Sequence, residues 1–321
     1  MAIARHFARA TPRDHYQELT DRIVAELEAG TRPWQKPWDP NKAGGPAMPL
    51  NAASGRRYRG INTLLLGMSP LAFMASDPRW CTYKQAAEKG WQVRRGEKGT
   101  TVFFFKQLEI EDQKMSAEDG EHTKRIPLLR SFTVFHASQI DGIPPFNPPA
   151  IEETPWRRPD AVDIILRNSK ADIRIGGDRA FYSPATDHIQ LPCENSFKSP
   201  EGYAATALHE LAHWAGASHR LNRDLTGRFG SLAYAREELV GELTSYLVGS
   251  ELGLPTDVPN HASYLASWIK ILKSDRREIF RAAAAAQKCA DYCLAFHPGY
   301  AASMTHAADN EPQDDERSLA A

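Results

Sequence analysis

The sequence predicts an α+β protein of two domains, and three observations support this. With 321 residues, the chain is longer than a single domain usually is. A proline-rich stretch near its middle, over residues 142–159, is incompatible with a helix interior or a central strand. Two apolar, strand-like segments precede this stretch, and long helix-favouring segments follow it. We therefore expect a small α+β domain over residues 1–145, a linker over 146–159, a second domain over 160–300 and a disordered acidic tail over 301–321.

The charge is divided unevenly along the chain. The totals nearly cancel, with 39 Lys+Arg against 40 Asp+Glu and a net charge of −1. Residues 1–108, however, hold 17 Lys+Arg and 9 Asp+Glu, a balance of +8, which leaves 22 against 31, or −9, for residues 109–321. Such an asymmetry suggests that the front half meets a polyanion.

Composition also bears on the compartment. No segment approaches the roughly 18 apolar residues that span a bilayer, and the first ten residues lack the hydrophobic stretch of a secretory signal. We expect a cytoplasmic protein, which argues against a secreted protease without a nucleic-acid role. The four cysteines are too few and too scattered for a disulfide framework. Cys289 and Cys293 share a helix face, which is more typical of two buried thiols than of a metal site.

The first domain opens with an amphipathic helix over residues 14–29. Its apolar residues recur at helical spacing, and Gly30 lies where a C-terminal cap is expected. Further on, a helical segment at residues 83–89 precedes a glycine-bracketed basic hairpin over residues 90–99. A strand over residues 100–106 is expected to pair with one over 131–135, across a charged surface loop at 109–125.

Aromatic and cationic residues alternate in this first domain. Two Pro-Trp steps at residues 33–38 enclose cations, and a second basic cluster follows at residues 56–59. Cations neutralise phosphates and aromatic faces stack on unpaired bases, so this mixture is typical of a surface that binds single-stranded nucleic acid without sequence preference. The alternative is that the tryptophans are core residues and the cations form a solvated face. The candidate DNA-binding residues are Arg32, Trp34, Lys36, Trp38, Arg56, Arg57, Tyr58, Arg59, Arg94, Arg95 and Lys98.

The second domain carries a metal-binding pattern. His209, Glu210 and His213 form His-Glu-x-x-His within a helix-favouring run that contains no glycine or proline. Histidines four residues apart lie on one helix face and can coordinate one Zn²⁺. Glu210 is then placed to act as general base toward an attacking water.

A catalytic zinc site needs a third protein ligand. Glu238, 25 residues beyond His213 in a second predicted helix, fits the His₂Glu arrangement. Glu242 lies one turn further on the same face and could accept the outer ring N–H of a ligand histidine. Glu237 points about 100° away from Glu238 and is the alternative ligand.

Three other histidines and one tyrosine are further candidates for this site. His219 could ligate from a loop, but a surface position or a substrate-facing one fits it better. His188 alternates with apolar neighbours, which predicts a solvent-facing strand residue. Tyr182 or His261 could donate to the oxyanion that forms during peptide hydrolysis, although packing roles explain both at least as well.

These motifs, taken in order, resemble a known family. The front half resembles the ArdC-type antirestriction N-terminal domain, shared with conjugative primases of plasmids, through Arg57-Tyr58-Arg59-Gly60-Ile61-Asn62, Gly96-Glu97-Lys98-Gly99 and Phe135-His136-Ala137-Ser138-Gln139. The back half resembles that family's zincin-like metallopeptidase domain, through Asp187-His188-Ile189-Gln190-Leu191-Pro192, the His209–His213 motif and Glu237-Glu238-Leu239-Val240. One departure is Asn222, where relatives carry an acidic residue, so the contacts of that loop are expected to differ from theirs.

The resemblance implies a plasmid or mobile-element protein that binds single-stranded DNA and protects incoming DNA from host restriction. It implies Zn²⁺ as the metal, with Mn²⁺ or Co²⁺ also accepted by a His₂Glu site. A restriction protein or another DNA-bound protein is the expected peptide substrate. The alternative is a DNA-binding protein whose metal domain is structural or inhibitory and turns over little peptide.

Overall fold

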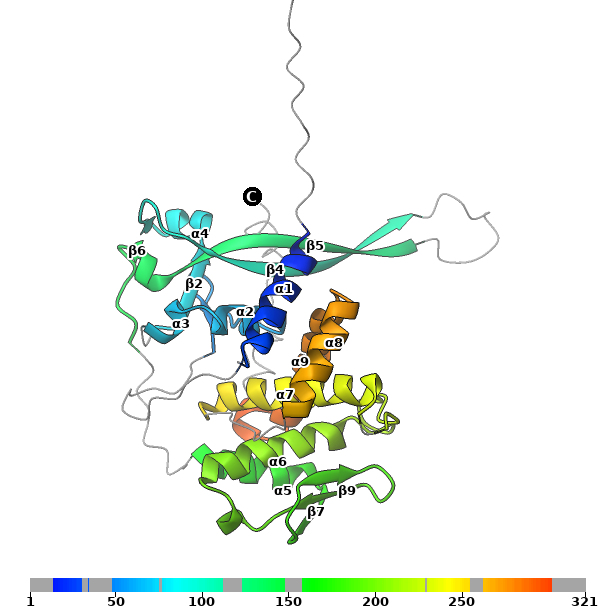
Figure 1. Cartoon of the computed structure of the whole chain (residues 1–321). Coiled ribbons are helices and arrows are strands. Elements are labelled where there is room, and N and C mark those ends of the chain that lie inside the picture. Colours follow the sequence, from blue (N-terminus) through cyan, green and yellow to red (C-terminus); the bar gives the residue numbers. More distant parts are fainter. Residues whose placement is uncertain are drawn as a thin grey trace, which may run out of the picture.

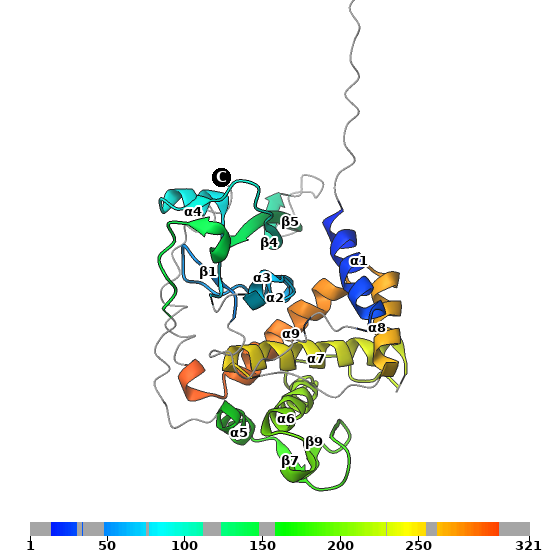
Figure 2. The same ribbon diagram turned by 60° about the vertical axis from the view of Figure 1, so that its left-hand side comes forward.

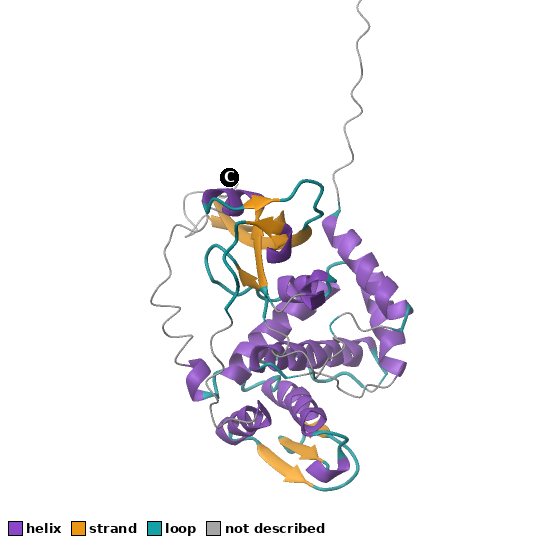
Figure 3. Cartoon of the chain, turned by 90° about the vertical axis from the view of Figure 1, so that its left-hand side faces the viewer, coloured by secondary structure: helices purple, strands orange, loops and turns teal. Residues whose placement is uncertain are grey.

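The computed structural model describes residues 14–30, 34, 48–74, 77–111, 123–147, 158–228, 230–254 and 262–301. Strands gather at two ends of the molecule, and most of the helices lie between them (Figures 1 and 3). The model confirms the mixed α+β class. Much of the proposed linker and almost all of the proposed tail lie outside the described residues. Among the helices in the described ranges, none is long and apolar enough to cross a membrane.

The N-terminal sheet has the strand order β1-β2-β5-β4. Its strands are β1 (Leu50–Asn51), β2 (Arg79–Thr82), β4 (Thr100–Glu111) and β5 (Thr123–His136). β4 and β5 form a long antiparallel hairpin in which Val102 faces Phe132. The predicted pairing of these segments is confirmed. The predicted loop is too long, because Glu109–Glu111 and Thr123–Arg125 continue the ladder and satisfy their backbone hydrogen bonds there.

Short elements surround this sheet. They are α2 (Ile61–Gly67), α3 (Leu71–Met74), α4 (Tyr83–Glu88), β3 (Gln92–Val93), η1 (Ala137–Gln139) and β6 (Ile140–Asp141). Thr82 and Gln85 form a capping box that fixes the start of α4. The predicted basic hairpin over residues 90–99 is not formed, because β3 pairs with β6 instead of with the segment that follows it.

The C-terminal part is mainly helical. It contains α5 (Arg158–Ser169), β7 (Asp172–Ile175), β8 (Phe181–Ser183), β9 (His188–Leu191), η2 (Glu194–Ser196), α6 (Pro200–Ala215), α7 (Leu232–Leu252), α8 (Ala262–Ser274) and α9 (Glu278–Leu294). Ser199 caps α6 and Pro200 occupies its first turn. The three strands form a sheet of order β7-β9-β8 that contacts α6. α7 is buried along most of its length because α6, α8 and α9 all pack against it.

The first helix, α1 (His15–Glu28), packs against this helical part. Its predicted apolar face is confirmed: Leu19, Ile23, Val24 and Leu27 are buried. They join a core cluster that also contains residues of α8 and α9, and Figure 2 shows α1 beside α8. Thr20 Oγ1 donates to the carbonyl of Arg276 at 2.9 Å. The front and back of the chain therefore share one core.

Candidate metal centre

Helix α6 places two histidines on one buried face. His209 and His213 are one turn apart, and their Nε2 atoms lie 3.0 Å from each other. Both residues are buried. Because both residues lie on one unbroken helix, the helix period alone sets their spacing, which explains why the sequence pattern predicted them.

Helix α7 brings a carboxylate to the two imidazoles. One oxygen of Glu238 lies 3.5 Å from Nε2 of His209, and the other lies 3.5 Å from Nε2 of His213. The three residues offer ligand atoms that all lie within 4.8 Å of one another. Glu238, and not the alternative Glu237, thus completes the three-residue cluster.

The cluster fits a divalent metal ion. Two nitrogens bound to one tetrahedral Zn²⁺ at about 2.0–2.1 Å are about 3.3 Å apart, close to the observed 3.0 Å. The α7 backbone also comes unusually close at Gly241, where an added Cβ would meet Cε1 of His213 at 3.0 Å and Cε1 of His209 at 3.1 Å. Two imidazoles and one carboxylate are a donor set for Zn²⁺, Mn²⁺ or Co²⁺.

Glu210 lies beside the cluster and is buried. Burial raises the pKa of its carboxyl group, although the nearby His209 and His213 oppose this shift. The backbone N–H of Tyr182, in β8, donates a hydrogen bond to it. A carboxylate held beside the two ligand histidines is positioned to take up the proton of an attacking water, as a general base requires.

Glu237 occupies the outer side of His213. Its Oε1 lies 3.0 Å from Nδ1 of His213, and Arg223 donates to both of its oxygens, from Nε at 3.0 Å and from Nη2 at 2.6 Å. Burial lowers the pKa of His213, but the bond to Glu237 and the charge of Glu238 outweigh it and raise this pKa to about 9. Sequence reasoning had assigned the outer-partner role to Glu242 and had weighed Glu237 only as a ligand.

The loop after α6 explains how Arg223 reaches this position. Asn222 adopts a left-handed backbone with φ of 51°, which asparagine tolerates better than most residues. Arg223 then turns back to the end of α6, where its Nη2 donates to the carbonyl of Ala212 at 2.6 Å. A side chain at Gly216 would put a Cβ 2.7 Å from this nitrogen. Asn222 is the position at which the sequence departs from its relatives. It is followed directly by Arg223, which contacts Glu237 beside the metal centre.

Replacing Glu237 by glutamine is expected to lower metal affinity by about 10- to 100-fold. A neutral amide holds the Nδ1–H of His213 less firmly and loses the charge pairing with Arg223. The measurement is a Mn²⁺ titration followed by electron paramagnetic resonance. Arg236→Gln is the control, because this neighbouring residue of α7 pairs with Glu278 and not with the cluster. Unchanged affinity in Glu237→Gln would show that His213 needs no such partner.

Tyr182 and His261 are the candidate oxyanion donors. The hydroxyl of Tyr182 donates to Asp187 at 2.8 Å, and Arg220 fixes the same carboxylate. His261 lies outside the described residues. Sequence reasoning missed Tyr234 and Tyr264, whose hydroxyls lie 3.1 Å apart, and Tyr234 hydrogen-bonds to Glu238. No sequence signal distinguishes these two tyrosines from core residues.

The other two histidines lie outside the cluster. His219 is exposed, with its Nε2 3.3 Å from Asp187. The prediction that His188 faces solvent is wrong: this residue is buried, and its Nδ1 lies 2.6 Å from the hydroxyl of Thr186. Ile189 and Leu191 of the same strand point into the core. His188 points to the opposite face of the sheet, where it lies on the middle strand and the ring of Phe181 packs edge-on against it, with 5.8 Å between the ring centroids.

The described DNA-binding candidates fall into three groups. Arg56, Arg95 and Lys98 are exposed. Arg57 pairs with Glu251, Arg59 with Asp291, and Arg94 with Glu97 and Asp141. Tyr58 is half-buried and accepts from Asn51 at 3.2 Å, and Trp34 is only 1% exposed. The expectation that Trp34 stacks on bases is thus wrong for this structure, because its ring is enclosed in the core. Arg32, Lys36 and Trp38 lie outside the described residues.

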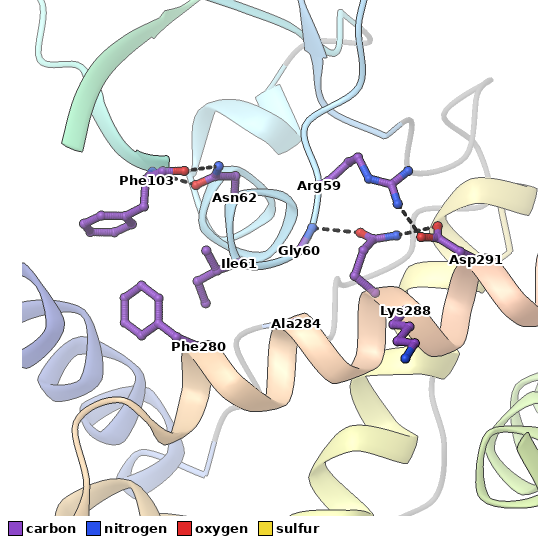
Figure 4. A pocket seen from close by; sticks show the side chains of 10 residues that line it. Arg59, Gly60, Ile61, Asn62, Phe103, Phe280, Ala284, Lys288 and Asp291 are labelled. Carbon is purple, nitrogen blue, oxygen red and sulfur yellow. Dashed lines mark hydrogen bonds and ion pairs between the residues drawn. The ribbon is translucent and has the colours of Figure 1, made fainter. Parts of the chain in front are cut away.

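Segment 59–62 borders a cavity between α2 and α9. Figure 4 shows it, and its volume is about 400 Å³. Gln287 of α9 accepts from the backbone N–H of Gly60 at 2.8 Å, and Arg59 pairs with Asp291 of the same helix. The basic segment of the front half is therefore tied to the helical part of the chain.

Two family models match the chain. The model of the N-terminal domain of the anti-restriction factor ArdC covers residues 13–135. A zincin-like metallopeptidase model covers residues 160–285, which include the whole cluster.

Similar proteins support the same relationship. DNA primase TraC of Escherichia coli is 46% identical over 295 residues, which are 88% of this chain but only 27% of the primase. The chain thus spans about a quarter of that relative. Uncharacterized protein y4eC of Sinorhizobium fredii (strain NBRC 101917 / NGR234) is 40% identical over 285 residues, which are 88% of this chain and 92% of y4eC.

Solved structures extend the match to three dimensions. The metal-free structure of the antirestriction protein ArdC from plasmid R388 superposes with a TM-score of 0.72 at 40% identity, covering 89% of this chain and 99% of that one. Its Mn(II)-bound structure gives a TM-score of 0.71 at 39% identity. The two family models follow one another along the chain and the solved structures cover nearly all of it, and the chain belongs to the ArdC family of antirestriction proteins.

Proposed function

We propose that this protein relieves host restriction of incoming DNA, that it binds single-stranded DNA through its basic front half, and that it hydrolyses peptide bonds at the metal centre. The observation that carries the peptidase part is the intact, buried Glu210 beside the His209–His213–Glu238 cluster. A structural site needs ligands but no general base. The expected peptide substrate is a restriction protein or another protein bound to DNA.

The residues of the cluster divide the work. His209, His213 and Glu238 hold the metal, with Zn²⁺ as the default and Mn²⁺ or Co²⁺ as alternatives. When bound, the metal supplies Lewis acidity that activates a water molecule and polarises a peptide carbonyl. Glu210 takes the proton of the attacking water at its carboxylate and returns it to the departing amine. Glu237 holds the outer nitrogen of His213 so that Nε2 stays directed at the cluster.

In a second candidate function, the protein has the same fold but does not hydrolyse peptide bonds. In it, the metal stabilises the helical domain, and the protein acts by covering DNA or by blocking a nuclease. The observation that favours it is the shared core, because a domain buried against the DNA-binding half can act as its support.

Replacing Arg95 and Lys98 together by glutamate is expected to weaken binding of a fluorescent single-stranded oligonucleotide by about tenfold to a hundredfold. If each contacts one phosphate, the slope of log affinity against log salt falls by about 1.4. Both side chains are exposed on the basic front half. The full chain is used, because α1 and Trp34 pack into the helical part. Fluorescence anisotropy across a salt series provides the measurement.

The matched control is Arg179→Glu with Lys198→Glu, two exposed cations of the helical part. An equal loss in the control would place the interaction with DNA outside the front half. Failure of the unaltered protein to bind the oligonucleotide at low salt would rule out the proposed DNA interaction and leave a metal-dependent peptidase.

A further inference from the structure

Trp34 is buried in the core, although the cations around it in the sequence also allowed an exposed, base-stacking position. Its indole is buried, with its ring 5.7 Å from that of Trp268 in α8. Its Nε1–H donates to Oε1 of Glu242 in α7 at 3.3 Å. A residue of the N-terminal segment thus inserts between the helices of the metal-binding part and contacts a carboxylate there.

Glu242 stands between this indole and a ligand histidine. It lies one turn beyond Glu238 on α7 and is only 2% exposed. Its Oε2 lies 4.0 Å from Nδ1 of His209. This Nδ1 is buried and has no hydrogen-bond partner among the residues that the structure describes.

The two histidines therefore differ in how their outer nitrogens are held. His213 has Glu237 at 3.0 Å, whereas the carboxylate beside His209 stands just beyond hydrogen-bond distance. A metal-binding histidine usually donates its outer N–H to such a carboxylate, which fixes the tautomer that leaves Nε2 free to bind metal. Glu242 is the carboxylate that can accept the outer N–H of His209. Whether it does so depends on the orientation of its side chain.

We propose that Trp34 is a positioning residue of the metal centre. By holding Oε1 of Glu242, its indole N–H keeps Oε2 directed at Nδ1 of His209 and so favours the metal-binding orientation of that imidazole. Trp34, which precedes the β1-β2-β5-β4 sheet in the chain, thereby becomes part of the metal site. This inference concerns metal affinity and holds with or without peptide hydrolysis.

The test is a double-mutant cycle on the full chain, read out as Mn²⁺ affinity by electron paramagnetic resonance. Trp34→Phe removes the N–H and retains an aromatic ring, and Glu242→Gln retains the volume and removes the charge. Each is expected to weaken Mn²⁺ binding by about tenfold. If Trp34 acts through Glu242, the double variant binds no more weakly than Glu242→Gln alone.

Trp80→Phe is the control, since Trp80 is an equally buried tryptophan in β2, away from α7. Its Mn²⁺ affinity should match that of the unaltered protein. An equal loss in Trp80→Phe would show a general effect of lost packing and overturn the proposal. So would unchanged affinity in Trp34→Phe, or effects of Trp34→Phe and Glu242→Gln that multiply in the double variant.

A spectroscopic readout covers the case in which Trp34→Phe folds poorly. In the ¹H–¹⁵N spectrum, the indole N–H signal of Trp34 is expected to move when Glu242 is replaced by glutamine and again when Zn²⁺ is added. Both shifts follow if the indole N–H bonds to a carboxylate whose other oxygen engages a metal ligand. An indole signal that moves neither with the substitution nor with Zn²⁺ would contradict the proposal.

Discussion

Replacing His209 by alanine is expected to lower metal affinity by at least about three orders of magnitude. The protein would then offer only two ligands, His213 and Glu238, and a tetrahedral site with two protein ligands does not retain its ion at micromolar concentration. The metal content of the purified protein and a Mn²⁺ titration provide the measurement. Binding of single-stranded DNA should be unchanged, because the cluster lies in the helical part and the exposed candidate cations lie in the front half.

The control for this prediction is His219→Ala. His219 follows His213 by six residues but is exposed and lies beside Asp187. The His219→Ala variant should retain one metal ion per chain with unaltered affinity. If His219→Ala lost the metal while His209→Ala kept it, the cluster in α6 and α7 would not be the binding site.

The metal ligands could be predicted from the sequence because their geometry is local. One helix period places His209 and His213 on the same face, and no tertiary contact is needed for that. Glu238 required one further step, a second helix at a suitable distance along the chain. The structure adds that glycine at position 241 favours this close approach of α7, since a Cβ there would lie 3.0 Å from Cε1 of His213 and 3.1 Å from Cε1 of His209.

The partners of the ligands could not be predicted in this way. Glu237, Glu238 and Glu242 all lie on one helix, and their roles depend on how α7 crosses α6. The choice of Glu237 for His213 also depends on Arg223, which arrives from a loop through the left-handed Asn222. Neither the crossing nor the loop path is encoded in a local pattern.

In the fold, too, local features could be predicted from the sequence and long-range contacts could not. The apolar face of α1 followed from its spacing, but its partner α8 is more than 200 residues away in the sequence. Trp34 had two interpretations of equal weight, because an exposed stacking residue and a core residue have the same composition around them. The position of α8 decides between them, since Trp268 of this helix packs against the buried Trp34 ring.

Replacing Glu210 by glutamine is expected to reduce peptide hydrolysis by about 10²- to 10⁴-fold while leaving metal and DNA binding intact. Glutamine fills the same buried volume and still accepts the backbone N–H of Tyr182, but it cannot take up a proton. The rate of cleavage of fluorescently labelled casein by the Zn²⁺- or Mn²⁺-loaded protein provides the measurement. Undiminished cleavage in Glu210→Gln would show that another group is the base.

The same variant separates the two candidate functions when relief of restriction is measured in parallel, as recovery of plasmid transformants in a restricting host. If hydrolysis is the means of relief, Glu210→Gln loses both activities, as His209→Ala does. If the metal domain is structural, Glu210→Gln still relieves restriction, whereas His209→Ala loses relief together with its metal. The decisive comparison is between these two neighbouring residues of one helix, because one substitution removes a ligand and the other removes only a proton acceptor.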